Sequence, residues 1–358
     1  MSKTLTRNVA INGRFLTQSM SGVQRVASEI AIRLANRIKG LRILCPPGPI
    51  KLASVAENLP VEIVGSCTGH LWEQFSLPRA LSRLGHPILL NITGLSPIFY
   101  SRKALWIHDA SLFDHPEWFG WSYRLYYNTL LPLAARRAAA VLTVSDFSRE
   151  RLVAHFPWID PIVIHSGVQT PPPTVTAGPP EILFALGSLD ARKNQEVLPR
   201  ILAHLDRKVK LRITGAAPGH LKSKIDLLDS RLEYTGYVRD EQLEQYFQEA
   251  SIFIAPSLYE GFDLPPLEAM ARGIPVIASD IPVHREILGN AAVLVDSRQP
   301  EEFARAIRDL LDNPSKMKSL SLQGRKRARE FSWDYAVDRI LDLLDGWNFE
   351  PGEKAELP

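Results

Sequence analysis

The chain has 358 residues, of which 45% are hydrophobic and 23% charged, and its formal net charge at pH 7 is +3. This length exceeds what one hydrophobic core usually supports, so we expect two domains, and the small charge is too weak to indicate nucleic-acid binding by itself. Cys45 and Cys67 lack the spacing of a metal or redox motif, and residues 1–13 lack an apolar signal core. No stretch is long enough to span a bilayer, so we expect a cytoplasmic protein.

The first half of the chain alternates short apolar runs with helical or polar segments. Between the first two runs, Val23 to Ile38 repeats apolar residues at helical spacing. This alternation predicts a doubly wound α/β domain over residues 1–170. The runs typical of buried parallel strands are 8–12, 41–45, 61–64, 88–91, 105–108, 140–144 and 162–165.

Two positions in this domain are candidate ligand contacts. Gly22 stands at the amino end of the predicted helix, where a side chain would obstruct the close approach of a phosphate. His108 closes a predicted strand and is therefore expected at the carboxyl edge of the sheet, with Asp109 either orienting its imidazole or capping the loop. More commonly, a glycine before a helix only forms a turn, and a histidine at a strand end is packed and hydrogen-bonded rather than catalytic.

The segment 116–139 is rich in aromatic residues and arginine. We expect most of it to form a core and a helix face. Alternatively, some of these side chains line an acceptor groove or contact anionic lipid, because amphipathic aromatic residues and arginine favour interfaces.

Five prolines and two glycines in 167–180 predict a linker at 171–180. A second α/β domain is predicted over 181–331, and the basic residues Arg325, Lys326, Arg327 and Arg329 are expected to form a solvated face. Its predicted strands are 182–186, 211–215, 232–238, 252–255, 275–278 and 292–295. An apolar stripe at helical spacing follows Ser332 and predicts a final helix within 332–358.

Two carboxylates, Glu260 and Glu268, flank the turn from a predicted strand into a helix. Glu260 precedes the helix, and the backbone N–H groups of Gly261, Phe262 and Asp263 are expected to be available to an anion there. Glu268 can accept two hydrogen bonds at once, which suits a ribose diol. An isolated pair of this kind is usually solvated, but the surrounding glycine, prolines and strands favour a ligand site.

A second loop of the same type follows the strand 182–186. Gly187 begins it, and Arg192 and Lys193 come next, where they can neutralise a diphosphate, arginine as a planar fork and lysine as a point charge. Adjacent basic residues on a loop are usually solvated. Here they stand between a strand and a helix, the same context as the glutamate loop.

Residues 260–279, EGFDLPPLEAMARGIPVIAS, resemble the nucleotide-sugar motif of the retaining glycosyltransferases of family four, which have the two-domain GT-B fold. Residues 106–119 and the SGVQR stretch 21–25 also resemble segments of that family. The family most often has glycine where this chain has Asp263, and many members have arginine where it has Ser188. The resemblance also implies that the final helix crosses back onto the first domain.

The resemblance implies the following roles. Glu260 and His108 would contact the transferred sugar, Glu268 would hold the ribose, and Arg192 and Lys193 would stabilise the leaving diphosphate. The expected donor-binding residues are Gly22, Gly187, Arg192, Lys193, Tyr237, Val238, Glu260, Gly261, Phe262, Asp263, Leu264 and Glu268. Tyr237 and Val238 would pack against the nucleobase.

The expected reaction is transfer of a sugar, with retention, from a nucleoside diphosphate sugar to a glycan or polyprenyl-diphosphate-linked acceptor in bacterial surface-polysaccharide synthesis. GDP-mannose is the first donor to consider. No Asp-x-Asp pair occurs, so we expect no metal and no cofactor. Peripheral association with the cytoplasmic face of the inner membrane is a further expectation. The alternatives are a nucleotide-sugar epimerase, a nicotinamide-dependent oxidoreductase, against which the missing dinucleotide fingerprint argues, and a non-catalytic nucleotide-sugar-binding protein.

Overall fold

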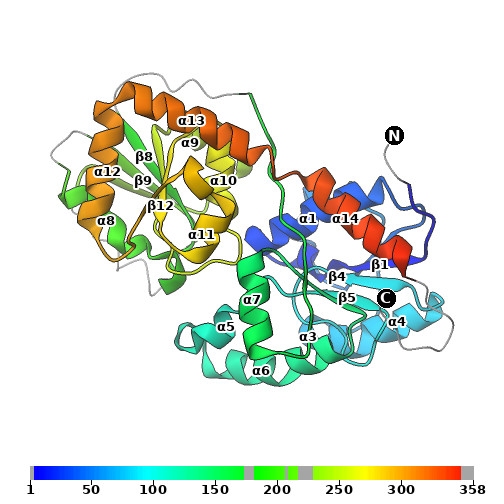
Figure 1. The fold of residues 1–358 in the computed structure, drawn as a ribbon. Coiled ribbons are helices and arrows are strands. Elements are labelled where there is room, and N and C mark those ends of the chain that lie inside the picture. The colour runs from blue at the N-terminus through cyan, green and yellow to red at the C-terminus, as the bar shows by residue number, and fades with distance from the viewer. Residues whose placement is uncertain (1–3, 173–180, 206–208, 217–228, 348–358) are drawn as a thin grey trace. The chain divides into compact units, whose positions relative to one another are not determined.

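The computed structural model describes residues 4–172, 181–205, 209–216 and 229–347. They form two compact units (Figure 1). Unit 1 holds residues 4–167 together with 333–347, and unit 2 holds the described residues between 168 and 332. Most of the predicted linker, at 173–180, and the end of the predicted final segment, at 348–358, lie outside the described residues.

Unit 1 is built on a parallel sheet in the order β3-β2-β1-β4-β5-β6-β7. The strands are β1 Val9–Asn12, β2 Arg42–Cys45, β3 Val61–Ile63, β4 Ile88–Asn91, β5 Lys103–Trp106, β6 Ala140–Thr143 and β7 Ile162–Val163. The central strands β1, β4, β5 and β6 are buried at every residue, as expected for a parallel sheet covered on both faces. β5 ends at Trp106 rather than at the predicted His108, so His108 lies in the loop that follows.

Residues 4–167 of unit 1 also contain seven α-helices, five of which bury apolar side chains. They are α1 Gly22–Ala35, α2 Ala53–Ala56, α3 Gly69–Leu71, α4 Leu77–Arg83, α5 Ser111–Asp114, α6 Trp121–Arg136 and α7 Asp146–His155. Short helical turns also occur at η1 Gly13–Thr17, η2 Trp72–Ser76 and η3 Pro116–Trp118. One core cluster joins β5 and β6 to α6 and α7, and another joins β1, β2 and β4 to Trp72 and α4.

The final helix, α14 Trp333–Gly346, lies beside α1 in unit 1 (Figure 1). Its apolar stripe is buried, with Ile340, Leu341 and Leu344 at most 1% exposed. An ion pair at its surface joins Arg37 Nη2 to Asp338 Oδ1 at 2.6 Å. The chain therefore returns to its first unit after completing the second.

Unit 2 is also built on a parallel sheet, in the order β10-β9-β8-β11-β12-β13. The strands are β8 Ile182–Leu186, β9 Lys210–Thr214, β10 Leu232–Gly236, β11 Ile252–Ala255, β12 Val276–Ser279 and β13 Val293–Val295. The helices are α8 Leu198–Ala203, α9 Asp240–Glu249, α10 Leu264–Ala271, α11 Pro282–Ile287, α12 Pro300–Asp312 and α13 Pro314–Ala328. Short turns lie at η4 Ala191–Lys193, η5 Gln195–Val197 and η7 Gly289–Ala291.

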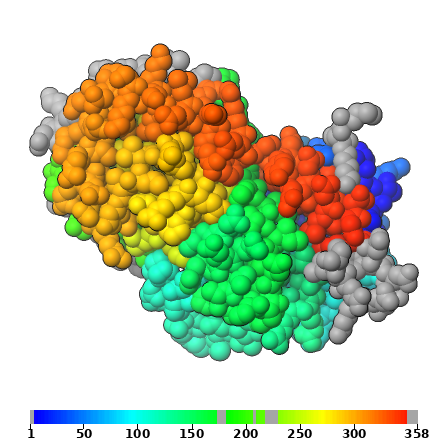
Figure 2. All heavy atoms as spheres, viewed as in Figure 1, coloured from blue at the N-terminus to red at the C-terminus, as the bar shows by residue number. Residues whose placement is uncertain are grey.

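Helix α13 corrects one sequence-based expectation. The basic residues near its end do not all form a solvated face, because Arg327 Nε and Nη2 donate to the carbonyl oxygens of Ile287 and Glu286, at the end of α11. Gly324 faces α10, where an added Cβ would lie 3.2 Å from Met270 Cγ. Figure 2 shows α12 and α13, in orange, covering one face of unit 2.

Candidate functional site

Three charged side chains meet at the carboxyl edge of the sheet in unit 2. Lys193 Nζ lies 2.6 Å from Glu260 Oε1 and 2.8 Å from Asp263 Oδ1, and the three side chains are 13%, 6% and 2% exposed. Lys193 follows β8 and the carboxylates follow β11, which pairs with β8 in parallel. The loops after paired parallel strands emerge at the same edge, so residues about seventy positions apart come together.

Burial and charge act in opposite directions in this cluster. Burial opposes the charged form of Lys193, but Asp263 and Glu260 outweigh it and raise the pKa of the ammonium group. Burial also opposes ionisation of Asp263, yet Lys193 and His284 hold the pKa of its carboxyl well below the usual range. Burial, with a contribution from the Asp263 charge, raises the pKa of Glu260. Asp263 therefore stays ionised, whereas the ionisation of Glu260 depends on the charges beside it.

Asp263 occupies a backbone conformation that favours glycine, with φ +67°. Its side chain is held from two directions, by Lys193 and by His284 Nε2, which lies 3.1 Å from Asp263 Oδ2. His284 is fully buried, and its Nδ1 lies 2.8 Å from the carbonyl oxygen of Ser279. The chain thus keeps the left-handed turn that glycine would adopt and uses the carboxylate to anchor Lys193.

Sequence analysis missed His284. It lies in α11, twenty-one residues beyond Asp263, and no local pattern joins the two. The available signal was a histidine two residues after a proline that begins a helix, shortly after a predicted strand end. A buried polar side chain in that context needs a partner, and Asp263 is that partner.

Gly187 and Arg192 complete the loop after β8. An added Cβ at Gly187 would lie 3.0 Å from Gln195 Nε2 and 3.2 Å from Lys193 Cδ, so the glycine makes room for the lysine side chain. The carbonyl oxygen of Arg192 accepts a hydrogen bond from Leu258 N at 2.8 Å, which joins this loop to the glutamate loop. The Arg192 side chain is 29% exposed, with Nε 4.0 Å from Asp190 Oδ1.

The remaining predicted donor contacts of unit 2 lie on neighbouring elements. Gly261, Phe262 and Leu264 are buried at the start of α10, and Glu268 is half-buried on the same helix. Tyr237, 64% exposed, and the half-buried Val238 follow β10. The structure brings Lys193, Glu260 and Asp263 into direct contact, whereas the ribose and base roles of Glu268, Tyr237 and Val238 stay predictions.

His108 and Gly22 belong to unit 1. His108 Nε2 lies 2.8 Å from the carbonyl oxygen of Ile92, so this nitrogen carries the proton and donates, leaving Nδ1 as an acceptor. Burial lowers the pKa of the imidazole, which favours the neutral form. Asp109 Oδ1 accepts a hydrogen bond from Ser111 N at 2.8 Å, so Asp109 caps the loop. Gly22 is exposed, and an added Cβ there would meet no atom within 4 Å among the described residues.

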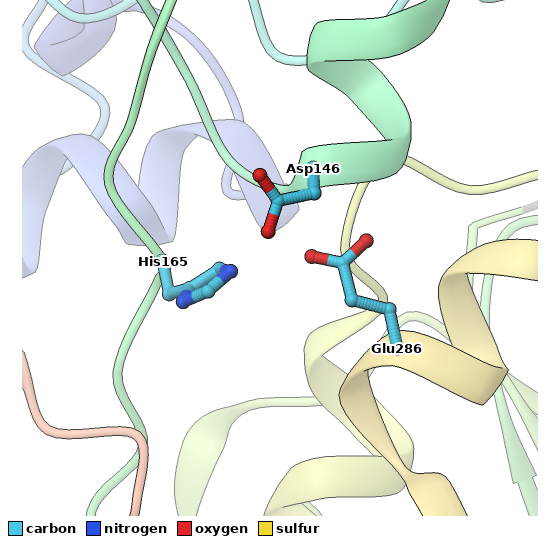
Figure 3. Close-up of side chains that lie close together, drawn as sticks. All are labelled: Asp146, His165 and Glu286. Atoms are coloured by element: carbon cyan, nitrogen blue, oxygen red, sulfur yellow. The ribbon is translucent and has the colours of Figure 1, made fainter.

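Figure 3 labels three further ionisable side chains, Asp146, His165 and Glu286. Asp146 lies in the first turn of α7 and His165 lies just after β7, both in unit 1, whereas Glu286 lies on α11 of unit 2. The sequence-based expectation of chemistry without a metal stays a prediction.

Two family models together match most of the chain. One, described as Glycosyltransferase Family 4, matches residues 20–170, and the other, Glycosyl transferases group 1, matches residues 180–313. The chain is 28% identical to O-antigen chain mannosyltransferase B of Escherichia coli, over 69% of this chain and 72% of that protein. It is 24% identical to O-antigen chain mannosyltransferase RfbU of Salmonella typhimurium, over 75% of each.

Solved structures share the fold. Anabaena Alr3699/HepE in complex with UDP and glucose superposes with a TM-score of 0.75 at 17% identity, covering 95% of this chain and 100% of that one. WaaG, a glycosyltransferase involved in lipopolysaccharide biosynthesis, superposes with a TM-score of 0.71 at 15% identity, covering 94% and 100%. The GT-B fold predicted from the sequence is confirmed.

Proposed function

Because the chain belongs to the glycosyltransferases of group 1 and family 4, we propose that it moves a sugar from a nucleoside diphosphate sugar to a glycan or lipid-linked oligosaccharide. The observation that carries this proposal is the buried group of Lys193, Glu260 and Asp263 at the carboxyl edge of unit 2. Burying charges is costly even when they are paired, and perturbed ionisable groups of this kind concentrate at functional sites.

In the proposed reaction, the bond between the anomeric carbon and the diphosphate oxygen breaks and a bond to the acceptor hydroxyl oxygen forms on the same face of the sugar. The acceptor proton passes to the departing diphosphate, so the anomeric configuration is retained. Glu260 orients the sugar, and His108 accepts a hydrogen bond from a sugar hydroxyl through Nδ1. Glu268 holds the ribose, and Tyr237 and Val238 contact the base.

Positive charge on the protein replaces a metal in this proposal. Charge develops on the diphosphate as it leaves, and preorganised cations stabilise it. Lys193 is compensated by two carboxylates, and the partly exposed Arg192 provides the second positive charge for the phosphates. Gly22 in unit 1 and the Gly187 loop in unit 2 allow the backbone to approach the diphosphate.

The donor is tested by measuring nucleoside diphosphate release from GDP-mannose, UDP-glucose and dTDP-glucose. GDP-mannose is the first choice because two similar proteins are O-antigen mannosyltransferases. Release that requires an added acceptor supports transfer, whereas acceptor-independent conversion of the sugar would indicate an epimerase. Chelation of divalent ions is expected to leave the rate unchanged, and proton NMR of the product is expected to show retention.

We also propose that unit 1 rests on an anionic membrane surface through α6. Trp121, Leu125 and Leu133 are 76%, 63% and 41% exposed at helical spacing, and the Arg136 guanidinium lies 4.7 Å from the centre of the half-exposed Trp158 ring. Apolar side chains beside arginine favour the interface of anionic lipids. Among the described residues, no helix is long and apolar enough to cross a bilayer.

Flotation with phosphatidylglycerol vesicles tests the membrane proposal. The double variant Trp121→Ser, Leu125→Ser is expected to bind vesicles at least tenfold less than the wild type. Leu322→Ser is the matched control, because Leu322 is an equally exposed leucine, at 62%, on α13 of unit 2. Equal flotation of the wild type and the double variant would contradict this proposal.

A further inference from the structure

The sheet of unit 1 has its own topological switch point, between β1 and β4. From β1 the chain passes to β2 and β3 on one side, and then returns to β4 and its neighbours on the other. Open parallel sheets bind ligands in the crevice beyond the carboxyl ends of the strands at such a point. Here the two strands end at Asn12 and Asn91.

A buried polar network occupies this position. Asn12 Nδ2 donates to Asn91 Oδ1 at 2.7 Å and to Glu73 Oε1 at 3.2 Å. Asn91 Nδ2 in turn donates to the carbonyl oxygens of Thr93 at 3.1 Å and Gly94 at 3.3 Å. Asn12, Asn91 and Glu73 are at most 1% exposed. The network fixes a buried carboxylate beneath the loops that follow both strands.

Glu73 holds two side chains that reach the surface. Its Oε2 lies 2.8 Å from Arg14 Nη1 and 3.1 Å from His70 Nδ1, and the Arg14 and His70 side chains are 14% and 37% exposed. Arg14 Nη1 donates to Glu73 Oε2 at 2.8 Å and also lies 3.3 Å from His70 Nδ1. Gly94, at φ +70°, lets the backbone come close, because an added Cβ would lie 3.3 Å from both Arg14 Nη1 and Glu73 Oε1.

The atoms that remain available are complementary to hydroxyl groups. A carboxylate accepts from His70 Nδ1, so that nitrogen carries the proton, and in the neutral imidazole Nε2 is an acceptor. Among the described residues, Arg14 forms side-chain hydrogen bonds only through Nη1, which leaves the donors Nε and Nη2. A donor and an acceptor held side by side match a hydroxyl, which both accepts and donates.

Aromatic rings border these groups. The His70 ring lies 4.5 Å from Tyr126, and Tyr127 stacks on Tyr123 at 4.3 Å, with Tyr123 45% exposed. Apolar rings with a few fixed polar groups are typical of sites for small organic ligands. Since Glu73 compensates the Arg14 charge, the cluster has little net charge to attract a diphosphate. A neutral hydroxylated ring fits better than a phosphate.

We propose that Arg14, His70 and the neighbouring tyrosines form a carbohydrate-binding subsite of unit 1, built on Glu73 and the β1/β4 switch point. Its assignment as the subsite for the acceptor sugar rests on the proposed transferase function. Its ability to bind a neutral sugar does not depend on that function. Arg14 and His70 contact hydroxyl groups, Glu73 positions both, and the partly exposed Tyr123 borders them.

The test measures binding of methyl glycosides of mannose, glucose, galactose and N-acetylglucosamine to the full chain by ligand-observed NMR titration. Arg14→Gln and His70→Phe, which keeps the ring beside Tyr126, are each expected to weaken glycoside binding about fivefold or more, the equivalent of one lost hydrogen bond. GDP and UDP affinities are expected to stay at the wild-type value in both variants.

His115→Phe is the matched control. His115 is also 37% exposed, its Nδ1 lies 3.1 Å from Glu117, and its ring lies 4.0 Å from Trp118, but it is outside the Asn12–Glu73 network. Tyr123→Leu is a second variant for the case in which Arg14→Gln fails to fold, because a half-exposed tyrosine tolerates replacement. This variant is also expected to weaken glycoside binding.

Three results would contradict the subsite proposal. The wild type binds no glycoside, the wild type and the variants bind glycosides equally, or the variants lose nucleotide binding rather than glycoside binding. Failure of the transferase proposal is recognised separately. In that case no sugar nucleotide is turned over by the wild type, while glycosides still bind at Arg14 and His70.

Discussion

Replacing Asp263 by asparagine removes the negative charge beside Glu260, Lys193 and His284. Asparagine tolerates the left-handed backbone at φ +67° and can still accept from Lys193 through its amide oxygen. The carboxylate charge is lost. Because that charge raises the pKa of Glu260, we expect Glu260 in Asp263→Asn to ionise at a lower pH than in the wild type.

The size of this effect follows from the ion pairs. Lys193 Nζ lies 2.6 Å from Glu260 Oε1 and 2.8 Å from Asp263 Oδ1, so these two oxygens are at most about 5.4 Å apart. At an effective dielectric constant of about 20, two charges at that separation repel by about 3 kcal/mol, equivalent to about two pKa units. Relaxation of Lys193 towards Glu260 acts in the same direction.

The assay is the rate of nucleoside diphosphate release as a function of pH. If Glu260 acts as a carboxylate, the acid limb of the kcat/KM profile should move down by about one to two pH units in Asp263→Asn. Asp280→Asn is the control, because Asp280 pairs with Arg285 in the same unit but outside the Lys193 group. An unchanged acid limb, or one moved to higher pH, would refute the reasoning.

Four further substitutions test single positions. Glu260→Ala should retain nucleotide affinity, measured calorimetrically, and lose nearly all transfer; transfer at the wild-type rate would remove Glu260 from the mechanism. Gly215→Ala should fail to give soluble protein, because its Cβ would lie 1.9 Å from the carbonyl oxygen of Gly187, whereas Gly22→Ala, with nothing in the way, should melt like the wild type but show a raised KM for the donor. Burial lowers the pKa of Lys103 to about 7 from 10.5, so the unfolded chain binds its proton more tightly. The free energy of unfolding of the wild type, measured in urea, should therefore rise from about pH 7 to pH 10.5 relative to that of Lys103→Met. A difference between the two proteins that does not change with pH would contradict this.

Much of the fold was predictable because parallel strands are short, buried and strongly apolar. The runs ending at Asn12, Asn91 and Ala255 match the observed strand ends, since burial on both faces leaves a continuous apolar signal. The run ending at His108 was placed two residues too late. Lys103 belongs to β5 although it is charged, because it is buried with Nζ donating to backbone carbonyl oxygens.

The candidate site was predictable only where charged residues follow the end of a predicted strand. The loops of Lys193 and Glu260 could be placed at one sheet edge, but a direct ion pair between them depends on strand order and side-chain direction. His284 and the Asn12–Asn91–Glu73 network join residues that are distant in sequence and lack any periodic pattern. Such contacts follow from tertiary packing, which no local motif records.

The most direct test of the central claim is a crystal structure of the protein grown with an intact sugar nucleotide. We expect the diphosphate within hydrogen-bonding distance of Arg192, the ribose at Glu268 and the sugar beside Glu260. A sugar nucleotide bound away from the loops that follow β8 and β11 would contradict the assignment of unit 2 as the donor site.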